Sequence, residues 1–196
     1  MKTLLCIVSY NGNPDQSNLD SLEMIDGFEM NVYIGPVFTE RHQWHYNEHV
    51  RKIEDMCMMK NENLKKAYEI IKGKENEYNI AIMDSDKILN DKAIEEYKSK
   101  ISDDTIIYYP FKIKKTLYNK NIYKNMKIWL DHGATINNPF LMNGKTFIRI
   151  YEEMKGNIFK NKDSEWYNEE LGFTDDCFYK MKINFKESKN WISELR

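Results

Sequence analysis

Short apolar runs and longer amphipathic stretches alternate along the first 110 residues of the chain. Nearly unbroken apolar runs predict buried strands at residues 3–9 and 78–83, and two further apolar segments predict strands at 31–38 and 105–109. Apolar positions that recur every three or four residues predict helices. We expect these helices at about residues 19–25, from about 44 to 59, at 64–71, from a cap at Asn90 or Asp91 onward, and at 145–154.

This order of elements predicts the fold class. Strands that alternate with helices are typical of an α/β domain with a mostly parallel central sheet flanked by helices. Residues 112–136 show no clear period, and residues 172–179 are expected to form a loop that opens a short helix. The chain has 196 residues and no linker of biased composition, so we expect one domain that spans residues 1–196.

The overall charge narrows the possible partners. The chain has 29 basic and 31 acidic residues and a net charge of −2, so charge alone predicts no general affinity for nucleic acid or anionic membranes. Lysines and aromatic residues interleave within residues 112–129. They form either a solvated face or a surface for a phosphate or a polyanionic acceptor.

Cysteine content and hydropathy indicate the cellular compartment in which the protein is expected. Cys6, Cys57 and Cys177 are odd in number and widely spaced, which predicts neither a disulfide framework nor a zinc site. No segment approaches the roughly 20 apolar residues of a membrane-spanning helix. We therefore expect a cytoplasmic protein in a reducing environment.

Asp84, Ser85 and Asp86 carry the strongest chemical signal, because they directly follow the apolar run at 78–83. In open α/β sheets, ligands bind beyond the carboxyl ends of the strands. If the chain is extended there, both carboxylates project to the same side and suit Mg²⁺ or Mn²⁺. The alternative is that a polar triplet ends the strand and caps the next helix. The residues alone leave both interpretations open.

The order of motifs resembles the GT-A glycosyltransferases, notably the family-2-like nucleotide-sugar transferases. Val8-Ser9-Tyr10-Asn11 resembles their nucleotide-contacting loop, and EYNIAIMDSD at 77–86 resembles their approach to the metal site. Segments 138–147 and 172–181 follow in the family's order. The resemblance implies metal-dependent transfer of a sugar from a nucleotide-sugar donor, with a UDP-sugar as the expected donor. It also implies a donor half at about 1–110 and an acceptor half at about 111–196. The hydroxyl acceptor is open, and a glycan, a lipid, a protein or a modified nucleic acid would each fit.

The resemblance also implies residue roles. Asp86 would bind the metal directly, and Asp84 would hold the metal or the ribose. Asp176, with Asp175 beside it, would match the family's acidic pair and act as general base in an inverting reaction. The residues themselves allow another reading, in which this pair caps a helix. The remaining donor-binding residues would be Ser9, Tyr10, Asn11, Ser85 and Lys66, the last on the helix before the metal strand.

Two features depart from the family or compete with it. The segment 33–36 has no acidic residue where the family recognises the base, which leaves the nucleotide open. Paired aspartates after a strand also occur in metal-dependent phosphatases and nucleotidyltransferases, and a catalytically degenerate binding domain would keep the same pattern. His42, His45 and His49 have the spacing of one helical face, which is either a zinc arrangement or a polar surface.

Several common enzyme motifs are missing from the sequence. It has no G-x-x-x-x-G-K-[ST], no G-x-G-x-x-G and no G-x-S-x-G. This disfavours P-loop hydrolases, classical dehydrogenases and serine hydrolases.

Overall fold

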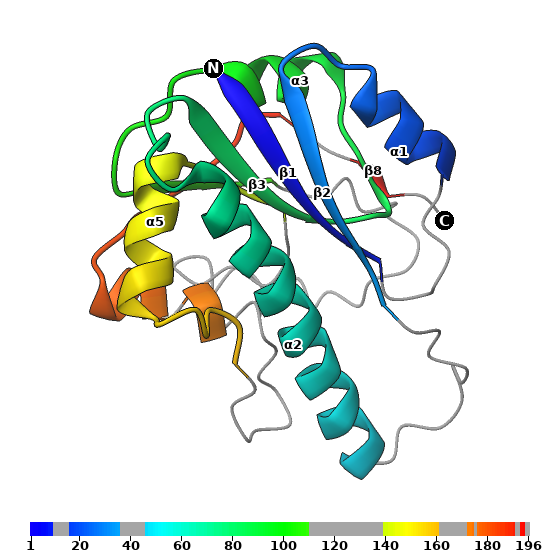
Figure 1. The fold of residues 1–196 in the computed structure, drawn as a ribbon, viewed down its shortest axis with the longest axis vertical. Coiled ribbons are helices and arrows are strands. Elements are labelled where there is room, and N and C mark those ends of the chain that lie inside the picture. Colours follow the sequence, from blue (N-terminus) through cyan, green and yellow to red (C-terminus); the bar gives the residue numbers. More distant parts are fainter. Residues whose placement is uncertain are drawn as a thin grey trace.

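A computed structural model describes residues 1–9, 16–35, 46–109, 139–160, 172–174, 176–190 and 193–194, with side chains from residue 56 in the helix that begins at 46. Its centre is a six-stranded sheet (Figure 1) in the order β2-β1-β3-β6-β5-β7. The strands are β1 (Lys2–Ser9), β2 (Phe28–Ile34), β3 (Tyr78–Asp84), β5 (Thr105–Tyr108), β6 (Phe140–Asn143) and β7 (Asn184–Glu187).

The sheet is mostly parallel, as the sequence predicts. Strand β1 runs parallel to both β2 and β3, and β5 runs parallel to β7. Only β6 is reversed, because it pairs antiparallel with both β3 and β5. The four predicted strands are confirmed with shifted ends: the strand predicted at 31–38 begins at Phe28 and ends at Ile34.

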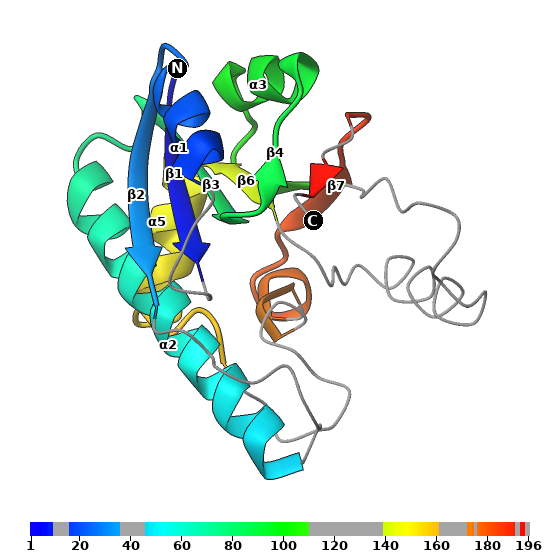
Figure 2. The same cartoon turned by 90° about the vertical axis from the view of Figure 1, so that its right-hand side faces the viewer.

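Helices cover both faces of this sheet, as Figure 2 shows from the side. One face carries α1 (Gln16–Glu23) and α3 (Asp91–Lys98), and the other carries α2 (Tyr46–Ile71) and α5 (Gly144–Glu153). A short π-helical turn, η1 (Asp176–Lys180), packs on the α2 and α5 side through Cys177. A separate two-stranded sheet joins β4 (Lys87–Ile88) to β8 (Ser193–Glu194).

The burial of β1 explains its apolar run. Leu4 and Cys6 belong to the core under α2 and α5, whereas Leu5 and Ile7 belong to the core under α1 and α3. Successive side chains of a strand point to opposite faces, so a strand covered on both sides is apolar at every position. The pattern therefore locates β1 in the interior of a two-sided sheet.

The observed extent of helix α2 differs from the prediction. The two helices expected at 44–59 and 64–71 form one continuous helix of 26 residues. No glycine or proline interrupts it, and Asn61 and Asn63, which lower the local helix propensity, form hydrogen bonds with other parts of the chain. A helix of this length rises about 39 Å, whereas a strand of seven or eight residues spans about 25 Å. Its first turns therefore extend past the carboxyl ends of β1 and β2, and both views show this overhang (Figures 1 and 2).

The later elements follow the predictions more closely. Asn90 caps α3, and its side chain accepts a hydrogen bond from the Ala93 amide. Phe147 and Ile150 of α5 are buried as expected. Within the described residues, no helix has the length and hydrophobicity needed to cross a bilayer.

Candidate functional site

The connections around β1 diverge at the carboxyl ends of the central strands. The chain leaves β1, forms α1 on one face and enters β2 on one side of β1. It then forms α2 on the other face and enters β3 on the opposite side of β1. Helices that diverge to opposite faces in this way leave a crevice beyond the carboxyl ends of the two central strands. The ends of β1 and β3 are therefore where a ligand is expected.

Ser9 and Asp84 end these two strands side by side. The register aligns Val8 with Asp84, and the Ser85 amide donates a hydrogen bond of 3.0 Å to the Val8 carbonyl. Ser9 is buried, and its carbonyl accepts a hydrogen bond of 2.8 Å from the amide of Gly35, which follows β2. The structure thus brings together Ser9, Asp84 and Ser85, three of the residues predicted for the donor site.

The acidic motif itself forms a turn, which we call the acidic turn (Asp84–Lys87). Ser85 and Asp86 have turn conformation, and Lys87 begins β4. The extended conformation that would place both carboxylates on one side is therefore wrong. The chain reverses here because β4 pairs with β8 instead of continuing β3.

Other segments hold the acidic turn in place. The side-chain amide of Asn18 in α1 donates to the carbonyl of Ser85 at 3.1 Å and to the carbonyl of Lys87 at 3.0 Å. The antiparallel register places Lys87 opposite Glu194. Contacts to β1, α1 and β8 together fix the backbone of the turn. A fixed backbone preorganises the side chains that it carries, as a binding site requires.

Within the turn, Asp86 and Lys87 form an ion pair. The Lys87 Nζ lies 3.2 Å from Asp86 Oδ1, and their side chains are 6% and 46% exposed. Asp86 Oδ1 is a buried atom, so the exposed part of this carboxyl group lies away from the lysine. A buried ammonium requires a counter-charge, and Asp86 supplies one.

The acidic turn offers oxygen donors of the type that Mg²⁺ and Mn²⁺ prefer. Asp84 is partly exposed, and Asp86 has an exposed side. In the part of the chain that the structure describes, no group of three or more His, Cys, Asp or Glu side chains gathers as a metal cage. Mg²⁺ at phosphate sites is held by one or two carboxylates with water and phosphate oxygens, so the two aspartates fit that kind of metal.

Asp176 lies on a different element, at the start of η1. Its side chain is 6% exposed, with Lys180 Nζ at 2.7 Å from Oδ1 and Lys160 Nζ at 3.7 Å from Oδ2. The neighbouring Phe173 packs against Phe140 and Phe159 in the core. Asp176 is therefore a buried carboxylate between two ammonium groups at the rim of an aromatic cluster.

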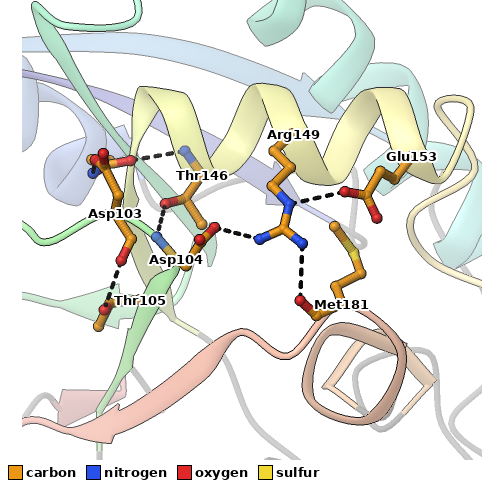
Figure 3. A network of polar contacts seen from close by, with 8 residues as sticks. Asp103, Asp104, Thr105, Thr146, Arg149, Glu153 and Met181 are labelled. Atoms are coloured by element: carbon orange, nitrogen blue, oxygen red, sulfur yellow. Dashed lines mark hydrogen bonds and ion pairs between the residues drawn. The ribbon is translucent and has the colours of Figure 1, made fainter.

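Two polar networks fix the surroundings of Asp176. Asn61 of α2 accepts hydrogen bonds from the amides of Ile158 and Phe159, which orders the segment that carries Lys160. On the other side, Arg149 of α5 donates to Asp104 at 2.5 Å and to the carbonyl of Met181 at 2.9 Å (Figure 3). Met181, the first residue after η1, is thus connected through Arg149 to α5 and to Asp104, which directly precedes β5.

The remaining predicted residues divide into two groups. Lys66 is exposed on α2, while its neighbours Asn63 and Ala67 are buried against the sheet, so Lys66 points away from the sheet. The others lie outside the residues or side chains that the structure describes; they are Tyr10, Asn11, Asp175, His42, His45, His49 and the lysines of 112–127.

Sequence reasoning missed four residues of these sites. Lys87 directly follows the acidic motif, and Lys180 is four residues after Asp176, a spacing that brings side chains together on a helical turn. Those two had a signal in the sequence. Asn18 and Lys160 reach their partners only through the tertiary fold, so no local pattern marks them.

Comparison with known proteins adds a distant structural likeness. No protein-family profile matches the chain, and no curated protein shows significant similarity to it. Among solved structures, the chain is similar to the crystal structure of a glycosyltransferase involved in the glycosylation of the major capsid of PBCV-1. The likeness has 10% sequence identity and a TM-score of 0.45, and it covers 100% of this chain and 93% of that chain. A likeness of this extent identifies no residue, substrate or reaction.

Proposed function

We propose that this protein is a metal-dependent glycosyltransferase that moves a sugar from a nucleotide-sugar donor to a hydroxyl acceptor. One observation carries the proposal: the acidic turn lies at the carboxyl end of β3, beside the end of β1, where the helix connections diverge. This is the position at which open α/β sheets bind nucleotides. It coincides with the motif order that resembles the GT-A transferases.

In this proposal the acidic turn binds the donor. Ser9 and Ser85 lie at the carboxyl ends of β1 and β3, next to the segment that contains Tyr10 and Asn11. Asp84 and Asp86 would hold Mn²⁺ or Mg²⁺, which supplies positive charge for the departing diphosphate. The donor we infer is a UDP-sugar.

Asp176 would accept the proton of the acceptor hydroxyl. A carboxylate suits this role when it comes within hydrogen-bond reach of the hydroxyl. The Asp176 side chain is itself 6% exposed, with Lys160 and Lys180 as its ion-pair partners, and burial limits the orientations of a positioned base. Asp175 would act beside it.

The proposal is tested by calorimetric titration of a panel of nucleotide sugars, with and without Mn²⁺, into wild type and Asp86→Ala. We expect one donor to bind in a metal-dependent manner and to lose at least about tenfold in affinity in the variant. The matched control is Asp26→Ala. Asp26 is exposed and precedes Gly27, whose carbonyl bonds Thr3 at the start of β1, so it lies at the opposite edge of the sheet.

The other outcomes separate the alternative functions. Absence of binding to every donor by folded wild-type protein would overturn the transferase proposal. Release of free phosphate or pyrophosphate from nucleotides would indicate a phosphatase or a nucleotidyltransferase. Tight donor binding without sugar transfer to any glycan, lipid, protein or nucleic-acid acceptor would indicate a binding domain.

A further inference from the structure

Lys87 has no role in the site as described so far, although it is the first residue after the acidic motif. Its side chain is almost fully buried, yet its ammonium lies 3.2 Å from a carboxylate that is nearly half exposed. An ammonium in this position costs free energy unless a negative charge stays close to it. Asp86 supplies such a charge, and nearly half of its own side chain is exposed to solvent.

The orientation of the Asp86 carboxyl group follows from this pairing. Oδ1 is buried and faces the lysine, which leaves the exposed side of the group for solvent or a ligand. The backbone of Lys87 is itself fixed, because its carbonyl accepts from Asn18 and its strand pairs with β8. The positive charge is thus a permanent part of the turn.

We propose that Lys87 is a built-in counter-cation of the acidic turn, which weakens the binding of a divalent metal alone and favours the joint binding of metal and nucleoside diphosphate. This inference rests on the proposed function for the identity of the second ligand. A fixed positive charge a few ångströms from a cation site repels the cation, and the same charge attracts a diphosphate. Metal and diphosphate together present less net charge to Lys87 than the metal alone does.

The proposal predicts effects of opposite sign for one substitution. In Lys87→Met, which keeps the length of the side chain without its charge, Mn²⁺ alone should bind at least about tenfold more tightly than to wild type. UDP in the presence of a chelator should bind at least about fivefold more weakly. Damage to the turn would weaken both ligands, so tighter metal binding is a result that a purely structural role does not produce.

The measurement is a titration of Mn²⁺ followed by electron paramagnetic resonance, and of UDP followed by calorimetry. Lys87→Arg, which retains the charge, should keep both affinities within about threefold of wild type. Mn²⁺ affinity that is unchanged or weaker in folded Lys87→Met would overturn the proposal. If Lys87→Met does not fold, Lys87→Gln is titrated in its place with the same expectations.

Wild-type protein gives a second test that needs no substitution. UDP should raise the affinity for Mn²⁺ by at least about tenfold, and Mn²⁺ should raise the affinity for UDP by the same factor, because coupling is reciprocal. A coupling below twofold would overturn the proposal. If UDP binds neither wild type nor Lys87→Met but Mn²⁺ still binds more tightly to Lys87→Met, Lys87 opposes the metal as proposed, whereas the joint binding of diphosphate and the proposed transferase function both fall.

Discussion

Asp86 and Asp176 are both carboxylates beside lysines, but they differ in exposure. The Asp86 side chain is 46% exposed next to a buried lysine, whereas Asp176 is 6% exposed next to Lys180, which is 70% exposed. In the Asp86–Lys87 pair the buried member is the lysine, whereas in the Asp176–Lys180 pair the buried member is the aspartate. A ligand can therefore reach one side of Asp86, while at Asp176 the exposed lysine is the group that can move aside.

This difference leads to a prediction for Asp176. Asp176→Asn keeps the size of the side chain but cannot accept a proton, so sugar transfer should fall by about 100-fold or more if this residue is the base. Donor affinity should change little, because the proposed donor site is the acidic turn and not η1. Initial rates of transfer and calorimetric donor titrations separate the two effects.

Lys180→Gln is the control for that prediction. It removes the Lys180 ion pair but leaves the carboxylate, which retains Lys160 as a partner. Transfer should therefore stay within a few fold of wild type. Retention of nearly full activity by Asp176→Asn would contradict the assignment of a base at this position.

Single residues also show how far the sequence predicts the site. The apolar run before Asp84 locates that residue at a strand end, because burial on both faces leaves a pattern in consecutive positions. The turn conformation of Ser85 and Asp86 could not be read the same way, since it depends on β4 pairing with a strand more than 100 residues later. Local patterns predict where a motif lies, and distant contacts decide its shape.

Among the secondary structure elements, α1 has a positioning role through one residue. Asn18 donates two hydrogen bonds to carbonyls of the acidic turn, so this side chain connects the helix directly to the turn. Each hydrogen bond of this kind contributes about 0.5–1.5 kcal/mol. The clamp is therefore important to the turn but not to the whole fold.

We predict that Asn18→Ala lowers the free energy of unfolding by about 1–2 kcal/mol and the melting temperature by about 2–8 °C. Donor affinity should fall by about tenfold, because the carboxylates lose their fixed orientation. Thermal denaturation and calorimetry measure the two quantities. Ser21→Ala is the control, since Ser21 is exposed on the same helix and bonds only one turn back to Ser17. Equal losses of affinity in both variants would contradict a specific clamp.

Element length explains which elements the sequence predicts. The helices α3 and α5 have caps at Asn90 and Asn143 and a repeating apolar face, and both were expected. Strands β4 and β8 have two residues each, which is too short for any period, and neither was predicted. Strand β6 lies in segment 138–147, which the sequence identifies only by its place in the family's order of motifs, because four apolar residues do not distinguish a strand from a loop.

At the scale of the whole molecule, strands from the later part of the chain belong to the same sheet as strands from the earlier part. Strand β6 lies between β3 and β5, and β7 extends the same sheet at its edge. The donor and acceptor halves predicted at about 1–110 and 111–196 therefore share one sheet. The division into halves therefore describes the order of motifs along the chain. The central sheet contains strands from both halves.

The last described strand returns to the candidate site. Strand β8 pairs with β4 directly after the acidic turn, so residues 193 and 194 contribute to a site whose chemistry lies at 84–87.

We predict that ending the chain after Asn190 weakens donor binding by at least about fivefold, because β4 loses its only described neighbour strand. Ending it after Glu194 retains β8 and should leave donor affinity unchanged. The main sheet is complete in both proteins, so their melting temperatures should agree within about 4 °C. Equal donor affinity in the two truncated proteins would show that the turn keeps its shape through β1 and α1 alone.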